Sequence, residues 1–280
     1  MIDPLTSLIQ SVEEADSSNL LLEAVQNLAS ARLEGAIPTL IAALSYNNPG
    51  AAVAAVEGLI HIGEPAVPAL LEQLELQNYT ARSWAIRALA GIGDPRGLIP
   101  LLGVATADFS LSVRRAAARG LGMMKWHWFP ADLLEIAQEE ALEALLFVAQ
   151  QDEEWVVRYS AVVGLQALAM AIPPTSLDWR SQIESQLAQM ANNDRSLAVR
   201  GRVLLAQQTL KETAKETSAS PSLNIDRSSA LSEADWQTIL VKLYDRKGEE
   251  RLVFAEGDPR RYRNLAGVIA PKDEGGASSI

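Results

Sequence analysis

The amino-acid sequence predicts an all-α protein, an α-solenoid of stacked helix pairs followed by a short mixed C-terminal extension. Two observations carry this prediction. A helical phrase recurs along residues 1–210, and a proline-containing phrase precedes each of its first three copies. The composition agrees, because apolar residues make up 48% of the chain and aromatic residues only 5%. Alanine and aliphatic side chains favour closely packed helices over a sandwich or a barrel.

The chain begins with an acidic, amphipathic phrase, LTSLIQSVEEA from Leu5, which we expect to cap the solenoid or to dock against a partner. No basic segment precedes an apolar run here, so the phrase does not resemble a secretory signal. The sequence also lacks an apolar run of the roughly 18 residues that a membrane span needs. We therefore expect a cytoplasmic protein without a membrane span.

The recurring phrase is expected to form the second helix of each pair. Its clear copies read AAVAAVEGLIHIG from Ala51, ARSWAIRALAGIG from Ala81 and LSVRRAAARGLG from Leu111. Weaker copies begin at Val156 and Ala198. Apolar residues spaced three and four apart form one stripe on a helix. A period of about 30–45 residues with two helices per unit is typical of an α-solenoid.

The first helix of each pair is predicted from the proline-containing phrases. These read AIPTLIAAL from Ala36, AVPALLEQL from Ala66 and LIPLLGVA from Leu98. Proline suits the first turn of a helix, where its missing N–H is not needed. We expect about five stacked pairs with apolar faces open at the ends, because no clear polar capping repeat follows. The sequence therefore predicts an obligate protein partner.

Small residues occupy one equivalent position in successive second helices: Gly58, Ala88, Gly120 and Gly164. A small side chain there allows neighbouring helices to approach closely. Gly63 and Gly93 directly follow their helices and fit the position after a helix end, where a positive φ is common. Both sets of residues support the same division into repeats.

Charged residues recur with the same period. Arginines stand early in four second helices, and aspartates precede the last three of them by six residues: Arg82, Arg114, Arg158, Arg200, Asp108, Asp152 and Asp194. This spacing resembles HEAT repeats, in which such residues form a structural ladder between neighbouring units. We expect Arg114 to pair with Asp108, and Arg158 with Asp152. Leu76 replaces the aspartate before Arg82, which leaves that arginine without its usual partner.

Cysteine is absent and histidine occurs only as His61 and His127. Disulfides, cysteine-ligated zinc and a thiol intermediate on this chain are therefore excluded, and a serine–histidine–aspartate triad is disfavoured. The acids are scattered rather than set at ligand spacing, so we predict no metal and an activity that survives chelation. The net charge is −11 without a long basic stripe, which argues against nucleic-acid binding.

The composition changes near Lys211. We expect a solenoid over residues 1–210, a flexible linker over 211–230, which is rich in Lys, Glu, Thr and Ser, and a small C-terminal extension of unknown role over 231–280. Within the extension, Ser232 and Asp235 predict a helix N-terminus.

That helix is expected to span Trp236–Tyr244 and to end by Gly248. The segment Leu252–Ala255 is expected to form a brief strand. The extension is too short to predict an independent core.

The densest aromatic cluster is Lys125–Pro130, which reads KWHWFP. One interpretation is a functional loop in which His127 donates a proton or binds a carboxylate. The other, which we favour, is a hydrophobic latch that closes the connection between two helices. His61 lies late in a helix, where the helix dipole explains it, and we assign it no chemistry.

A candidate binding surface follows from the second helices. Residues one and five places after the ladder position lie on one side, as the pairs Val53/Glu57, Ser83/Arg87, Arg115/Arg119 and Tyr159/Val163. Arg87, Arg115 and Arg119 should form a cationic patch. It either contacts a ligand or an acceptor protein, or is surface solvation or a contact with an acidic partner. Tyr79 and Trp84 are further candidates, although Trp84 also suits a core or interface role.

Three longer phrases resemble the phycobilin lyases of cyanobacteria, and more narrowly the F-type subunits of the heterodimeric E/F lyases. They are YNNPGAAVAAVEGL from Tyr46, ALAGIGDPRGL from Ala88 and DFSLSVRRAAARGLG from Asp108, and VQNLASARLEGAIPTLI from Val25 fits as well. The resemblance covers roughly residues 5–210. Isomerising F-type subunits use a Cys/His motif, which this cysteine-free chain does not have.

The resemblance implies an E-type partner subunit and a defined reaction. Phycocyanobilin is the substrate rather than a cofactor, and it becomes attached to a cysteine of the apo-phycocyanin alpha subunit through a thioether. The thiol belongs to the acceptor, so no residue of this chain is assigned a catalytic role.

This chain must instead hold the bilin. Its propionates call for arginines, its pyrrole N–H groups call for a carboxylate, and its rings call for apolar walls. The candidate bilin- or acceptor-binding residues are therefore Arg87, Arg115, Arg119, Tyr79, Trp84, Glu57 and Tyr159. Two alternatives stay open: a non-catalytic HEAT-repeat adaptor that binds phycobilisome proteins as a degradation or assembly factor, and a generic scaffold.

Overall fold

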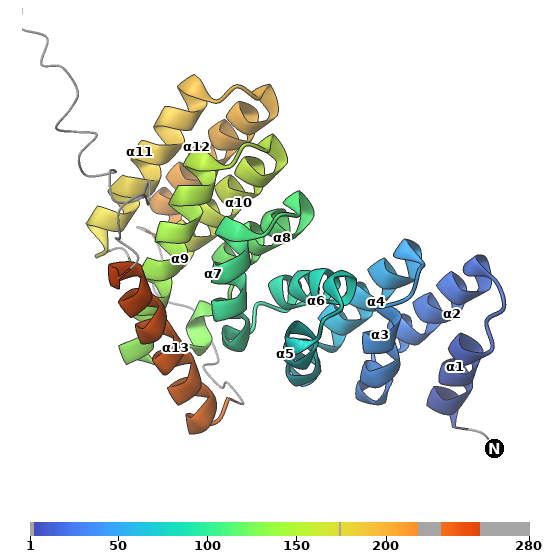
Figure 1. The fold of residues 1–280 in the computed structure, drawn as a ribbon. Helices are drawn as coiled ribbons and strands as arrows, with labels where there is room; N and C mark the ends of the chain where they lie inside the picture. Colours follow the sequence, from blue (N-terminus) through green and yellow to red (C-terminus); the bar gives the residue numbers. More distant parts are fainter. Residues whose placement is uncertain (1–2, 174, 218–230, 253–280) are drawn as a thin grey trace, which may run out of the picture.

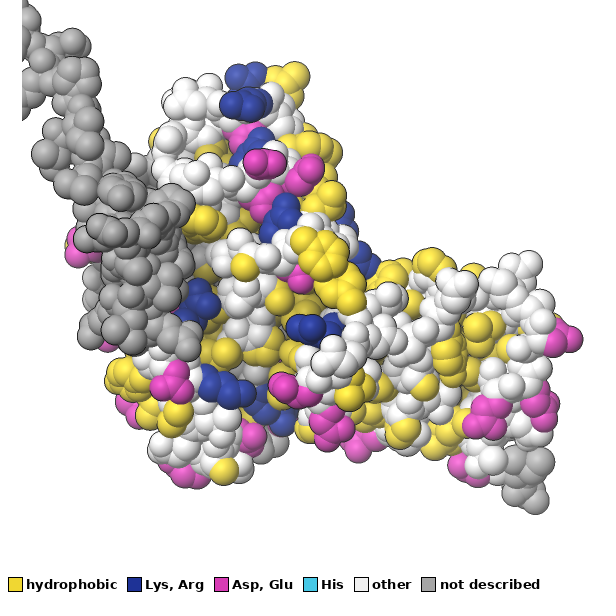
Figure 2. Space-filling view, in the orientation of Figure 1, with side chains coloured by type: hydrophobic (Ala, Val, Ile, Leu, Met, Phe, Trp, Pro, Cys, Tyr) yellow, Lys and Arg dark blue, Asp and Glu magenta, His cyan; other side chains and the backbone are white. Residues whose placement is uncertain are grey.

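The computed structural model describes residues 3–173, 175–217 and 231–252 and contains only helices, turns and loops over these ranges (Figure 1). Over these ranges six helix pairs stack into a solenoid, and Figure 2 shows hydrophobic side chains exposed along one of its faces. Their first helices are α1 (Pro4–Glu13), α3 (Ile37–Ala43), α5 (Val67–Glu75), α7 (Leu98–Ala107), α9 (Ala131–Gln151) and α11 (Leu177–Asn193). Their second helices are α2 (Ser18–Ala31), α4 (Pro49–Ile62), α6 (Tyr79–Ile92), α8 (Leu111–Gly122), α10 (Trp155–Ala171) and α12 (Leu197–Thr217).

The predicted all-α solenoid is confirmed, with one pair more than expected. The additional pair is α1 and α2, in which the acidic N-terminal phrase forms α1. Short 3₁₀ turns lead into α3, α5 and α7, and prolines stand in the first turn of α3 and α5, as expected. No single described helix is long and apolar enough to cross a membrane. Only α4 and the helical segment Glu64–Glu75 reach that length and composition together, and they are bent by 120°.

The second helices approach one another closely at the predicted small residues. A Cβ atom on Gly58 would lie 2.7 Å from the Ala29 Cβ, and one on Gly120 would lie 2.6 Å from the Ala90 Cβ. A Cβ on Gly164 would lie 2.4 Å from the carbonyl oxygen of Ala118. The absence of a side chain at these positions therefore sets the spacing of the layer that carries the candidate site.

The helix ends also follow the sequence prediction. Gly63 and Gly93 have φ values of 81° and 70°, the left-handed region in which glycine is favoured. Behind the layer of second helices, buried aliphatic residues form two core clusters. The N-terminal cluster extends to Ile92, and the C-terminal cluster begins at Ile86, so the two clusters meet at α6.

The linker predicted over residues 211–230 starts later than expected, because its first residues are helical. Helix α12 continues to Thr217, so residues 211–217 are helical, while residues 218–230 lie outside the described residues. Local bonds explain the longer helix, because the Gln208 side chain donates to Glu212 at 2.9 Å and the Thr213 hydroxyl donates to the Thr209 carbonyl at 3.0 Å. Polar composition alone does not end a helix that already has a buried face.

The C-terminal helix is also longer than predicted. Ser232 and Asp235 do form the expected cap, but α13 runs over Glu233–Leu252 and passes through Gly248. One glycine inside a helix costs only about 1 kcal/mol. The strand expected at Leu252–Ala255 is wrong at Leu252, which is helical, and its other residues lie outside the described ranges.

Helix α13 packs against α7 and α9 of the solenoid (Figure 1). Ile239 and Leu243 are buried in the C-terminal core cluster, and the Trp236 ring lies 5.5 Å from that of Phe129. Arg246 forms an ion pair with the buried Glu140, and Lys247 with Glu139. The described part of the C-terminal extension therefore shares the core of the solenoid.

Candidate functional site

A hollow of about 950 Å³ opens between the second helices α4, α6, α8, α10 and α12. Five predicted site residues line it: Glu57, Arg87, Arg115, Arg119 and Tyr159. We call this hollow the arginine groove. Glu57, Arg87 and Arg119 occupy the same place in three successive repeats, and Arg115 lies one turn before Arg119. Residues at one equivalent repeat position therefore lie next to one another on a single surface, as predicted from the sequence.

The three arginines of the groove are not paired with any described carboxylate. Among the described residues no acidic side chain lies within ion-pair distance of Arg87, Arg115 or Arg119, although Glu57 lines the same hollow. Burial lowers the pKa of Arg87, and the charge of Arg115 lowers it further. Like charges held together without counter-ions favour the binding of an anion.

Trp84 positions Arg87 rather than lining the groove. The Arg87 guanidinium carbon lies 4.2 Å from the centre of the Trp84 ring, a cation–π contact. Trp84 is partly buried and also packs against the N-terminal core cluster. The core role considered for Trp84 is therefore correct, and the same ring also fixes the direction of Arg87.

Apolar side chains form much of the rest of the groove. Trp155 and Tyr159 lie one turn apart on α10, while Ile60 and Met123 contribute from the ends of α4 and α8. The Arg119 Nε–H donates to the Met123 sulfur at 3.4 Å. Trp155 and Met123 were not among the residues predicted to line this surface. The signal for Trp155 was its position four residues before Tyr159 on the same predicted helix.

Tyr79 lies outside the groove and belongs to the ladder edge. Its hydroxyl donates to the Asp108 carboxylate at 2.9 Å, and its ring stacks on Phe109 with ring centres 4.4 Å apart. Tyr79 thus contacts the aspartate of the next repeat, a contact that an arginine makes in the later repeats. Arg82, predicted to lack its usual partner, is exposed and forms no ion pair with a described residue.

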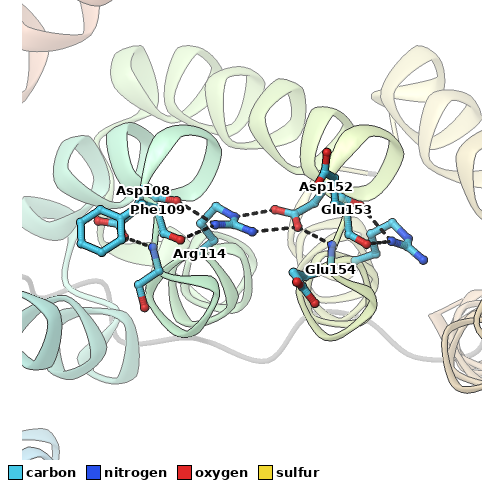
Figure 3. A network of polar contacts seen from close by, with 8 residues as sticks. Asp108, Phe109, Arg114, Asp152, Glu153 and Glu154 are labelled. Carbon is cyan, nitrogen blue, oxygen red and sulfur yellow. Dashed lines mark hydrogen bonds and ion pairs between the residues drawn. The ribbon is translucent and has the colours of Figure 1, made fainter.

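The ladder arginines pair across repeats, and Figure 3 shows the pair of Arg114 with Asp152. The Arg114 guanidinium donates to both carboxylate oxygens of Asp152 at 2.7 and 3.1 Å, and Arg158 binds Asp194 in the same way at 2.8 and 2.9 Å. The predicted pairing of Arg114 with Asp108 is therefore wrong, and so is the predicted pairing of Arg158 with Asp152. Arg114 Nη1 donates instead to the Asp108 carbonyl oxygen at 2.8 Å.

The geometry of the turn explains this shift. The arginine reaches back to the carbonyl of the turn that precedes its own helix, which leaves the fork of the guanidinium facing the next repeat. The hydrogen bonds to Asp152 and Asp194 raise the pKa of Arg114 and of Arg158. Arg200 stands in the last described helix pair, and no further described repeat offers it an equivalent aspartate. It forms no ion pair with a described residue.

The aromatic cluster is a latch, as favoured from the sequence. Trp126 and Phe129 are buried with ring centres 5.3 Å apart, and the Trp126 indole N–H donates to the Gly122 carbonyl at 3.2 Å. His127 is exposed and outside the groove. The described residues contain no group of three or more His, Cys, Asp or Glu side chains that could hold a metal ion.

The chain is similar to known proteins in its repeats and along its whole sequence. The HEAT repeat family matches residues 67–169. A protein named phycocyanobilin lyase subunit beta, from Pseudanabaena tenuis, is 64% identical over 277 residues, which cover 96% of this chain and 98% of the relative. The Synechocystis protein named phycocyanin alpha phycocyanobilin lyase CpcF is 53% identical over 162 residues, 58% of this chain and 75% of the relative.

A solved structure gives the same result. It is the complex of CpcE and CpcF of phycocyanin lyase from Nostoc, and the matched chain is 50% identical to this one with a TM-score of 0.56. The match covers 62% of this chain and 98% of the Nostoc chain. The sequence matches and the structure match therefore point to the same family of proteins.

Proposed function

The chain belongs to the family of phycocyanobilin lyase beta subunits, and we propose that it is the F-type subunit of a heterodimeric lyase in the cytoplasm. Together with an E-type partner, the lyase attaches phycocyanobilin to a cysteine of the phycocyanin alpha subunit through a thioether. A relative matched over 98% of its length carries the lyase name, which favours an enzyme subunit over a non-catalytic adaptor.

The arginine groove is the proposed bilin site. The observation that carries this assignment is its three arginines, which have no ion pair with a described residue. Phycocyanobilin has two propionates, and a planar guanidinium matches a carboxylate through two parallel hydrogen bonds. Arg87, Arg115 and Arg119 supply three such groups on neighbouring helices. A bound dianion also offsets the repulsion between Arg87 and Arg115.

The remaining groove residues fit the rest of the chromophore. Trp155, Tyr159 and Ile60 provide apolar and aromatic walls for the pyrrole rings. Glu57 supplies a carboxylate that can accept hydrogen bonds from pyrrole N–H groups. The acceptor's sulfur bonds to the ethylidene carbon of ring A, and the thiol proton passes to the bilin. The groove contributes by holding the bilin in position for this addition.

The experiment is co-expression of this chain with an E-type subunit, phycocyanobilin and the apo-alpha subunit. We expect denaturation-resistant bilin on the alpha subunit. Arg87→Ala and Arg119→Ala should lower transfer efficiency about ten- to a hundredfold, since losing one charge-assisted hydrogen bond costs about 1.5–3 kcal/mol. Arg82→Ala is the matched control, because Arg82 is an exposed arginine without a described ion pair on the same helix as Arg87.

Esterified bilin separates propionate binding from other roles of the arginines. Blocking the propionates should impair the wild type and Arg82→Ala strongly, and should have little further effect on the groove variants. Absence of covalent bilin with the wild type would refute the lyase assignment. Equal sensitivity to esterification in wild type and groove variants would refute the propionate site alone.

A further inference from the structure

An exposed aromatic patch lies on the ladder edge of the third and fourth repeats. It consists of Tyr79, Phe109 and Leu111, and we call it the Phe109 patch. The Phe109 side chain is 79% exposed and Leu111 is 42% exposed. Figure 3 shows the Phe109 ring pointing away from the Arg114–Asp152 pair. Large apolar side chains that are this exposed, when grouped, commonly mark an interaction site.

The position of Phe109 is polar in the following repeats. The residue after the ladder aspartate is Glu153 in the next repeat and Arg195 in the one after it. Burial cannot explain a phenylalanine there, because most of its side chain remains in water. Stacking on Tyr79 covers one face of the ring, but the residue remains 79% exposed, so core burial does not account for a phenylalanine at this position.

The exposed ring is also held in place by contacts within the chain. One face stacks on Tyr79, whose hydroxyl is bound to Asp108. The Phe109 carbonyl accepts a hydrogen bond from Arg114 at 3.2 Å. A side chain ordered before a partner arrives loses little conformational entropy on binding, which is typical of an interaction hot spot.

The patch adjoins the arginine groove. Ser110, between Phe109 and Leu111, has its hydroxyl 2.9 Å from that of Ser112, and Ser112 lines the groove. Trp155, which lines the groove from α10, is 46% exposed. A protein docked on the Phe109 patch would therefore stand beside the groove.

We infer that the Phe109 patch docks the acceptor protein, the phycocyanin alpha subunit, through an apolar surface next to its target cysteine. This inference rests on the proposed function, because the acceptor thiol must reach a bilin held in the groove. The small size of the patch supports the acceptor over the E-type subunit. Permanent subunit interfaces bury about 2,000 Å² or more, whereas three side chains suit a partner that leaves after each transfer.

The test is a kinetic comparison in the complex of this chain with its E-type subunit. Phe109→Ser should raise the KM for the apo-alpha subunit at least tenfold with little change in kcat, as expected for loss of a hot-spot side chain. Phe109→Trp should retain the wild-type KM. Leu20→Ser is the matched control, since Leu20 is 51% exposed on α2 and lies outside the groove and the patch.

The KM, the co-purification of the E-type subunit and the sensitivity to esterification together support or overturn the docking inference. A raised KM with normal co-purification of the E-type subunit and normal esterification sensitivity supports acceptor docking. Loss of E-type co-purification in Phe109→Ser would assign the patch to the subunit interface and overturn the inference. An unchanged KM would overturn it as well. Failure of the wild-type complex to attach bilin is a different result, because it refutes the proposed function before any variant is compared.

Discussion

Replacing Arg114 by alanine should destabilise the solenoid far more than replacing its equivalent, Arg200. Arg114 donates two hydrogen bonds to Asp152 and two to the carbonyls of the preceding turn. The Arg114 and Asp152 side chains are only 15% and 7% exposed. Removing the arginine leaves Asp152 with the Glu154 N–H as its described donor. Breaking a buried pair in this way lowers the free energy of unfolding by about 3–5 kcal/mol. Because both side chains keep some contact with solvent, we expect a loss of about 3 kcal/mol.

Thermal and urea unfolding would measure this change. A loss of about 3 kcal/mol corresponds to a fall of roughly 6–12 °C in the midpoint for a chain of this size. Arg200→Ala should change the free energy of unfolding by less than about 0.5 kcal/mol, since Arg200 has no described ion pair.

A double-mutant cycle with Asp152→Asn isolates the pair. We expect a coupling energy of about 1–3 kcal/mol between positions 114 and 152. A coupling below about 0.5 kcal/mol, or equal destabilisation by Arg114→Ala and Arg200→Ala, would refute the reasoning from the ladder geometry.

Two further predictions concern pH and packing. Burial raises the pKa of Asp194, but the hydrogen bonds from Arg158 and the Ser196 N–H leave it below the ordinary value of 3.8. The stability difference between wild type and Asp194→Asn, measured by urea unfolding, should therefore be constant from about pH 7 to 5 and shrink as the pH falls below 3.8. Gly122→Ala should lower the thermal midpoint strongly, because its Cβ would lie 2.0 Å from the Gly164 carbonyl oxygen. Gly103→Ala is the control, with no atom within 4 Å of its Cβ and a higher midpoint expected from helix propensity.

The repeat pattern made much of the structure predictable. Once the second helices were aligned, their fixed geometry placed Glu57, Arg87 and Arg119 on one surface without any long-range information. The close approach at Gly164 followed from the same alignment, because a small residue recurred at one helix position. Local periodicity is sufficient where each repeat contacts mainly its neighbours.

Contacts between distant segments were not predictable in this way. The partner of Arg114 is Asp152, 38 positions away, and the direction of its side chain depends on the turn carbonyl that it binds. Helix α13 looked like a short amphipathic stretch, yet its length depends on burying Ile239 and Leu243 against α7 and α9. Burial against another element is not visible in a window of sequence.

Arg114 and Arg115 show how one helix serves both stability and binding. They are adjacent in sequence, so the helix directs them about 100° apart. Arg114 therefore reaches the next repeat and is neutralised by Asp152, whereas Arg115 faces the groove beside Arg87 without a described acid. A groove optimised for stability alone would place acids opposite these arginines. Keeping the cations unpaired raises the free energy of the empty site, and a dianionic ligand then gains both its hydrogen bonds and the relief of that repulsion.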